Sequence, residues 1–203
     1  MIKWGYDWGY RSNGTTIIRL QGSITFKGNC LLAKASDIAV FPNAKLVVGG
    51  GGKILENTLI YCTRDIYIGQ NFSFTFQSSI MDTDFHYMVD IKNASVRRNS
   101  ASIHIGDNVW IGNRATIKKG VIIPDNTIVA ASYSVLTKDY SDIPPYSILG
   151  GCPAKLLSTG FSRIWKNEIS NSEKIDDIFI KNPQLEYITI DRKEINNLIY
   201  ECK

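Results

Sequence analysis

Residues 81–90, MDTDFHYMVD, concentrate groups that can move a proton. They include His86, one of only 2 histidines, with Asp82 and Asp84 close by. An imidazole has an ordinary pKa near ~6.5, so it can act as a general base and take a proton from an attacking hydroxyl. A carboxylate that accepts the second ring N–H would fix the tautomer, a role open to Asp84 or Asp82. Three alternatives stand: a backbone carbonyl as acceptor, aspartates that only shape the loop, and a structural histidine.

The other ligand-forming residues indicate no metal site. A zinc site of three histidines within one chain is excluded, because the sequence holds 2. We interpret His104 as a surface or interface residue. The cysteines are widely spaced without a CxxC pair, which favours buried reduced thiols over zinc ligands or disulfides. They are Cys30, Cys62, Cys152 and Cys202.

A six-residue repeat indicates which elements must position these groups. Aliphatic residues return at every sixth position, and a small or β-branched residue stands four positions after each of the first four. A helix repeats every ~3.6 residues and a strand every ~2, so neither produces this spacing. Three such units can close one triangular turn, and stacked turns form a parallel β-helix with the aliphatic side chains inside. The aliphatic positions are Ile105, Ile111, Ile117, Ile123 and Val129; the small ones are Val109, Ala115, Val121 and Thr127.

Upstream the repeat is weaker and changes register, which predicts bulges or small insertions. The glycines at 49–52 interrupt it, either as a corner of the coil or as a close approach to another chain; we favour the corner. Residues 81–102 lack periodic aliphatics, which predicts a loop thrown out from the coil, where site residues concentrate. The upstream positions are Leu20, Phe26, Leu32, Ile38, Val40, Leu46, Ile54, Ile60, Ile66, Ile68, Phe74 and Ile80.

The ends of the chain follow other patterns. The aromatic start, Trp4, Tyr6, Trp8 and Tyr10, predicts a cap over the open end of the coil, with stacking on a sugar as the alternative. After Pro153 the spacing ends, and Asp191 with Glu194 resembles a capping box that starts a helix. We expect an N-terminal cap at 1–16, a β-helix domain at 17–157 and a C-terminal helical extension at 158–203. The expected helix would place Ile195, Leu198, Ile199 and Cys202 on one face.

Composition and charge exclude several classes of protein. The 203 residues are 44% hydrophobic and 21% charged, which is typical of a globular chain with a real core. A net charge of +4 is too small and too scattered to indicate nucleic-acid binding. The sequence shows neither a leader pattern nor an apolar run of about 18 residues, so we expect a cytoplasmic protein without an integral membrane segment.

Residues 103–155, with the motifs VWIG, LTKD and GGCPAK, resemble the terminal coils of the hexapeptide-repeat acyltransferases. That family includes galactoside, maltose, serine and capsular-polysaccharide O-acetyltransferases. The resemblance implies a mainly β fold, a left-handed parallel β-helix. It also implies that His86 is the general base and that Trp110 forms a wall beside the acetyl and acceptor pocket. Subunit packing is the other interpretation of Trp110.

The resemblance further implies acetyl-CoA as co-substrate, with its pantetheine arm between neighbouring coils. Lysine is a plausible phosphate partner for its nucleotide end. Two departures blur this site: the segment AASYSVLTKD has one extra residue, which predicts a bulge near Tyr133, and Cys152 stands where the family usually has asparagine. The implied contacts are Asn113, Ala130, Ala131 and Ser132 for the arm, and Thr137, Lys138 and Lys155 for the nucleotide and phosphates.

The sequence and the resemblance therefore predict an O-acetyltransferase that acts on a sugar hydroxyl without a metal. A capsule, a lipopolysaccharide, a free oligosaccharide and a lipid-linked intermediate are all compatible acceptors. The family implies a homotrimer with active sites between subunits, so His86 and Trp110 would come from different chains. Arg97 and Arg98 hint at an acidic acceptor, although such arginines can simply be solvated. The alternatives are an amino-sugar N-acetyltransferase and a non-catalytic β-helix scaffold.

Overall fold

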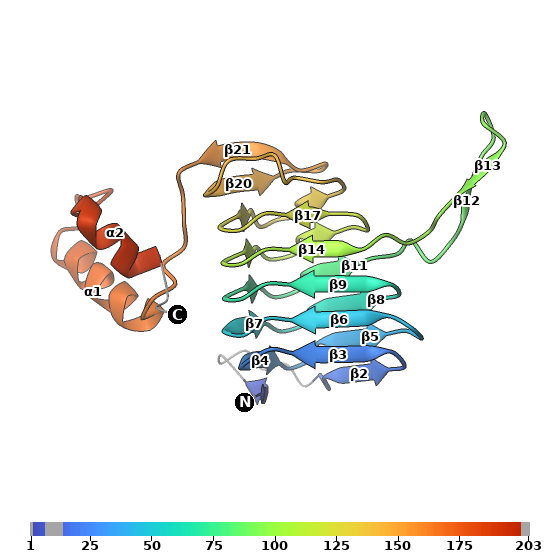
Figure 1. The fold of residues 1–203 in the computed structure, drawn as a ribbon. Helices are drawn as coiled ribbons and strands as arrows, with labels where there is room; N and C mark the ends of the chain where they lie inside the picture. The colour runs from blue at the N-terminus through green and yellow to red at the C-terminus, as the bar shows by residue number, and fades with distance from the viewer. Residues whose placement is uncertain (1, 7–13, 200–203) are drawn as a thin grey trace. The chain divides into compact units, whose positions relative to one another are not determined.

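Three sheets of short strands form the faces of a triangular coil in the computed structural model, which describes residues 2–6 and 14–199 (Figure 1). All pairings between stacked strands are parallel except the last, β20 with β21. Face A holds β1 (Ile2–Tyr6), β4 (Cys30–Ala33), β7 (Gly52–Ile54), β10 (Ser73–Phe74), β15 (Trp110–Ile111), β18 (Ile128–Val129), β20 (Ser147–Gly150) and β21 (Lys155–Thr159).

Faces B and C complete each turn of the coil. Face B holds β2 (Ile17–Leu20), β5 (Asp37–Val40), β8 (Leu59–Cys62), β11 (Ser79–Met81), β16 (Thr116–Ile117) and β19 (Val135–Leu136). Face C holds β3 (Ser23–Phe26), β6 (Lys45–Val48), β9 (Asp65–Ile68), β14 (Ile103–Ile105) and β17 (Ile122–Ile123). The chain visits the faces in the order A, B, C, so the parallel β-helix predicted from the repeat is confirmed.

The repeated aliphatic side chains fill the interior of the coil. The five positions from Ile105 to Val129 are at most 3% exposed, and the four small positions between them are fully buried. The prediction was wrong at Leu20, which is 55% exposed. Its strand β2 is the edge strand of face B and pairs only with β5, so no further coil covers it within the described residues.

The unequal lengths of the turns explain the weak upstream repeat. In the regular coils the Asn108 side chain donates to the Asn126 side chain, 18 positions further along the chain, which corresponds to three units of six. Upstream the turns are longer, since Cys30 pairs with Gly52 on the strand of the next turn. The expected insertions are confirmed, and they lie at the corners because the strands themselves stay in parallel register.

The glycine run forms the corner between β6 and β7, as favoured from the sequence. A Cβ atom on Gly49 would lie 2.2 Å from the carbonyl oxygen of Gly69 in the next turn. The close approach is therefore to a neighbouring turn of the same chain. Gly51 has a left-handed φ of +73°, and the asparagines Asn71, Asn108 and Asn126 take the same conformation at later corners.

The segment 81–102 leaves the coil between β11 and β14 and projects from it as an arm (Figure 1). The sequence predicted only a loop, but the arm contains an antiparallel hairpin of β12 (Met88–Asp90) and β13 (Ser95–Arg97). Asp90 stabilises its turn, since its carboxylate accepts hydrogen bonds from the Asn93 backbone and side chain and contacts Arg97.

Residues from Ser162 onward form a second compact unit with two helices, α1 (Glu168–Lys181) and α2 (Arg192–Ile199). The predicted helix start is confirmed in part, because the Asp191 carboxylate accepts the Lys193 backbone N–H at 2.9 Å. Cys202 and most of the aromatic start lie outside the described residues, and so do the side chains of Trp4 and Tyr6. None of the described helices has both the length and the apolar character to cross a bilayer.

Candidate active site

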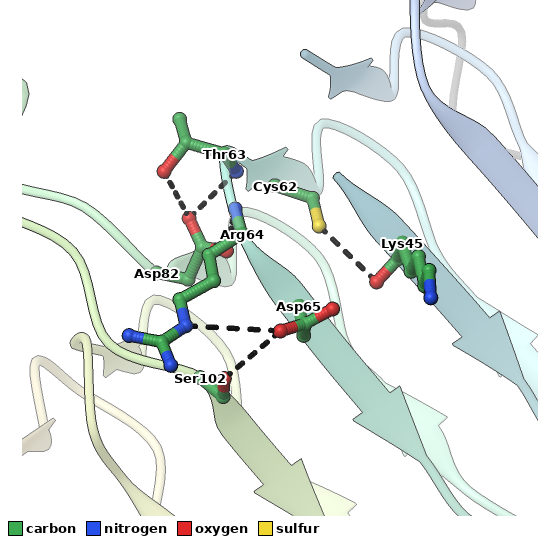
Figure 2. Close-up of polar contacts among 7 residues, drawn as sticks. All are labelled: Lys45, Cys62, Thr63, Arg64, Asp65, Asp82 and Ser102. Carbon is green, nitrogen blue, oxygen red and sulfur yellow. Dashed lines mark hydrogen bonds and ion pairs between the residues drawn. The ribbon is translucent and has the colours of Figure 1, made fainter. Parts of the chain in front are cut away.

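The start of the arm is bound to the turn below it through a buried carboxylate (Figure 2). Asp82 is 0% exposed. Its Oδ1 accepts the Thr63 backbone N–H at 2.7 Å and the Thr63 hydroxyl at 2.8 Å, and its Oδ2 accepts the Arg64 N–H at 2.7 Å. Residues 63–64 form the corner between β8 and β9, that is, the corner between faces B and C. A buried carboxylate needs hydrogen-bond donors of this kind. The three donors to Asp82 bind the start of the arm to this corner.

The end of the arm is bound to the same turn. The Ser102 hydroxyl donates to Asp65 Oδ2 at 3.2 Å, and Arg64 Nε lies 3.8 Å from that oxygen (Figure 2). Cys62, directly before this corner, donates to the Lys45 carbonyl, and burial raises the pKa of its thiol to about 12. Both ends of the arm are therefore bound to the same corner of the coil.

The residue before the candidate base is held in an uncommon conformation. Phe85 has a φ of +60°, which is costly for a bulky side chain and is found where the surroundings impose it. Its ring packs edge-on against Phe41 and Tyr61, with centroid distances of 5.9 and 5.8 Å. Its N–H donates to the Thr83 hydroxyl at 2.9 Å. These contacts hold the backbone of Phe85, the residue directly before His86.

His86 itself is exposed at the base of the arm. Its backbone N–H donates to the Asp84 carbonyl at 2.7 Å, and its ring makes no hydrogen bond or ion pair with any part of the chain that the structure describes. An imidazole in this state can receive a substrate hydroxyl from solvent. Its second ring nitrogen is equally open.

The Asp84 carboxylate, one of the two candidates for orienting His86, contacts lysines in the structure. Its oxygens lie 2.6 Å from Lys119 Nζ and 3.8 Å from Lys118 Nζ. Lys119 also donates to the Arg98 carbonyl at 2.9 Å, which binds the arm to the turn above it. Within the described residues, Asp82 and Asp84 thus both bind the arm to neighbouring turns of the coil. Neither carboxylate forms a hydrogen bond with the His86 ring.

Trp110 lies on a different side of the coil from His86. It is a partly exposed residue of β15 on face A, flanked by Ser73 and Ile128 on the neighbouring strands. His86 leaves the coil at the corner between faces B and C. The structure of one chain therefore does not bring these two predicted residues together.

The residues implied for acetyl-CoA fall into two groups. Asn113 and residues 130–132 form successive corners between faces A and B, where the Ser132 N–H donates to the Asn113 carbonyl at 2.9 Å. Thr137 and Lys138 follow β19 at the corner between faces B and C, and Lys155 begins β21. Among them Ala131, Ser132, Thr137, Lys138 and Lys155 are exposed.

The extra residue expected near Tyr133 is present in the last turn. Thr116 pairs with Val135, whereas Trp110 pairs with Ile128, so the last turn of face B is longer than its counterpart on face A by a single residue. Ser132 and Tyr133 both take left-handed φ values, +67° and +68°, and the insertion enlarges the corner between faces A and B. Ala131 and Ser132 are the small side chains of this corner, and the exposed Tyr133 ring beside them lies 5.8 Å from the Arg114 guanidinium.

The second histidine and the cysteines are not among the residues predicted for catalysis and acetyl-CoA. His104 is an exposed residue of β14 that stacks on Tyr67 at 4.8 Å, in agreement with its interpretation as a surface residue. Cys30 and Cys62 are buried free thiols, but Cys152 is exposed, contrary to the prediction, because it lies in the turn before β21. The described residues contain no group of three side chains suited to a metal.

The chain is similar to known acyltransferases in sequence and in fold. Galactoside O-acetyltransferase of Escherichia coli (strain K12) is 33% identical over 115 residues, which cover 46% of this chain and 53% of that protein. The chain thus spans about half the length of this curated relative. No protein-family model matches the chain.

Solved structures extend the likeness to most of the chain. The polySia specific acetyltransferase NeuO superposes with a TM-score of 0.58 at 21% identity, over 82% of this chain and 80% of that one. A variant of AntD, an N-acyltransferase from Bacillus cereus in complex with dTDP and coenzyme A, gives a TM-score of 0.59 at 17% identity, over 82% and 84%. At these identities the likeness shows the fold.

Together these findings confirm the resemblance predicted from the sequence. The protein has the left-handed parallel β-helix of the hexapeptide-repeat acetyltransferases, and its sequence is similar to that of a sugar O-acetyltransferase. The predicted fold class is confirmed, including the projecting arm and the C-terminal helices.

Proposed function

We propose that the protein is an acetyl-CoA-dependent O-acetyltransferase that modifies a sugar hydroxyl of a polysaccharide or oligosaccharide, with His86 as general base. The observation that carries the proposal is the exposed imidazole of His86 on an anchored arm, in a β-helix similar in sequence to galactoside O-acetyltransferase. Capsule, lipopolysaccharide and free oligosaccharide are the acceptor classes that it includes.

The chemistry requires one proton carrier and no covalent enzyme intermediate. His86 takes the proton of the acceptor hydroxyl as its oxygen attacks the thioester carbonyl. The tetrahedral intermediate then collapses, the carbon–sulfur bond breaks, and the same imidazole returns the proton to the departing thiolate. The products are the acetyl ester and the free thiol of CoA. A backbone N–H on the wall of the coil is the donor that we propose for the transient oxyanion.

The residues proposed for acetyl-CoA are suited to its parts. Ala130, Ala131 and Ser132 are small, and Ala131 and Ser132 are exposed at the enlarged corner, so the pantetheine arm can approach the backbone and pair its amides there. The exposed cations Lys138 and Lys155 can meet the phosphates. Thr137 and Asn113 complete the proposed contacts.

The position of Trp110 supports an active site shared between copies of the chain. His86 and Trp110 lie on different sides of one coil, so a pocket that uses both needs residues from two chains. The arm also exposes apolar side chains, which an isolated hairpin cannot bury. We therefore propose a homotrimer in which the arm of one subunit meets face A of the next. The exposed residues are Tyr87, Met88, Val89, Ile91 and Val96.

The buried free thiols Cys30 and Cys62 and the use of acetyl-CoA support a cytoplasmic placement. We propose no resident metal, because His86 alone supplies the proton transfer that the reaction needs.

Transfer assays with purified protein and acetyl-CoA test the acceptor class. The acceptors are neutral oligosaccharides, sialic-acid oligomers and amino sugars, and mass spectrometry detects the product. Mild base separates the two chemistries, because it cleaves an acetyl ester and leaves an acetamide intact. We expect base-labile acetylation of at least one glycan. Acetylation of amino sugars alone would replace the proposal by N-acetylation, an N-acyl transfer like the one named for AntD. CoA binding without transfer to any acceptor would indicate a scaffold.

A further inference from the structure

We infer that Asp82 is a positioning residue, which holds the start of the arm against the turn below so that His86 stands at a fixed place on the corner between faces B and C. The inference rests on the proposed function, because it takes His86 as the base. It assigns Asp82 no contact with either substrate.

The contacts of Asp82 fit a mechanical role. Its fully buried carboxylate is occupied by three donors from Thr63 and Arg64, at 2.7 to 2.8 Å. With both oxygens bound to these donors, the Asp82 carboxylate makes no hydrogen bond to the His86 ring. Figure 2 shows the three donors converging on Asp82 from the corner of the turn below.

Each of the three residues between Asp82 and His86 is held by a contact of its own. Thr83 is buried and bridges antiparallel to Ser100 on the returning strand of the arm. The Asp84 N–H donates to the Asn99 carbonyl at 2.8 Å, and the Phe85 ring, although 43% exposed, packs edge-on against two aromatic rings. Loss of the anchor at Asp82 would release the first residue of this rigid stretch, and a base displaced by about 1 Å can lose on the order of 10²-fold in rate.

The coil offers a matched control for the same interaction. Asp107, at a corner between faces C and A, accepts the Gln70 N–H of the turn below at 2.7 Å. No arm leaves the coil at that corner. A replacement there removes one carboxylate-to-backbone bond between neighbouring turns, from a partly buried aspartate, without touching the path to His86.

The experiment compares Asp82→Asn, Thr63→Val and Asp107→Asn with the wild type. An asparagine at 82 turns an NH2 group toward one of the backbone donors, whereas Thr63→Val removes only the hydroxyl donor. We expect kcat to fall on the order of 10²-fold for Asp82→Asn and by less than about tenfold for Thr63→Val. The KM for acetyl-CoA and the midpoint of the pH–rate profile should not move, and Asp107→Asn should retain the wild-type kcat.

Hydrogen–deuterium exchange supplies a readout that needs no substrate. Asp82→Asn should speed exchange in peptides covering 63–64 and 83–86, and Asp107→Asn should not. Wild-type kcat in Asp82→Asn, or a loss of kcat matched by Asp107→Asn, would overturn the inference. So would a shifted pH midpoint, which would indicate direct contact with the ring. If the wild type acetylates nothing, the proposed function fails, while unchanged exchange in Asp82→Asn would still refute the anchor.

Discussion

At the scale of single residues, the base proposed for the reaction stands apart from the carboxylates that surround it in sequence. Asp82 binds the backbone of the turn below, and Asp84 pairs with Lys119. In a triad of side chains an aspartate would hold the ring of the histidine. Here the backbone around His86 is held instead, which leaves the second ring nitrogen free for a backbone carbonyl or a partner subunit.

Replacement of Asp84 by asparagine tests whether this aspartate has an orienting role. The pair with Lys119 is partly exposed, so we expect the free energy of unfolding to fall by no more than about 1 kcal/mol. We also expect a modest loss of rate, because the carboxylate contacts a lysine and not the ring. Thermal unfolding and steady-state rates measure both.

Lys119→Gln is the control for Asp84→Asn, since it breaks the same pair from the other side, together with the Lys119 bond to the Arg98 carbonyl. Similar rates in the two variants would agree with a purely local ion pair. A loss on the order of 10⁴-fold in Asp84→Asn alone, as found when a triad aspartate becomes asparagine, would instead assign the orienting role to Asp84.

At the scale of elements, the corners decide how closely the turns can stack. The short strands pair in register, while the corners absorb turns of unequal length. Gly49 lies where the backbone of the next turn leaves no space for a side chain. The left-handed asparagines at other corners adopt a conformation that few residues take without cost.

Gly49→Ala should destabilise the coil by about 1–3 kcal/mol or more, as overpacking does, because the added methyl meets the Gly69 carbonyl at 2.2 Å. Urea unfolding measures the loss. Gly120→Ala is the comparison, since its cost comes from a left-handed φ of +75° while the nearest atom lies 3.5 Å away. Equal stability of wild type and Gly49→Ala would mean that the turns can separate at little cost.

The repeat of six predicted the interior of the coil well because it is a local pattern. Each aliphatic residue from Ile105 to Val129 is buried by residues that obey the same spacing. Leu20 follows the spacing too, but its burial depends on whether another turn covers it. The hairpin in the arm was missed for a related reason: Val89 and Val96 pair across a short turn that mixes polar residues with Ile91 and Ala94, and the segment shows no period.

At the scale of the whole molecule, the candidate site is distributed over more than one side of the coil. The sequence predicted its members one by one, and the family resemblance assigned their roles. The sequence could not predict that Asp82 binds Thr63, because this contact joins two residues that lie 19 positions apart, in neighbouring turns. Nor could spacing alone reveal that Trp110 and His86 lie on different sides.

A mixing experiment tests the shared site directly. His86→Ala chains and Trp110→Ala chains should each be inactive or nearly so, and co-refolded mixtures should regain a fraction of wild-type transfer. Recovery is expected because some interfaces in a mixed trimer combine an intact arm with an intact face A. Rates of mixtures are compared with those of each variant alone. Complete absence of rescue would count against a site built from two chains.

The most direct test of the central claim is the transfer rate of His86→Ala at saturating acetyl-CoA, with His104→Ala as the matched control on face C. The account predicts a loss of about 10²- to 10⁴-fold for His86→Ala, unchanged binding of acetyl-CoA, and a wild-type rate for His104→Ala. A His86→Ala protein that transfers acetyl groups at the wild-type rate would contradict it.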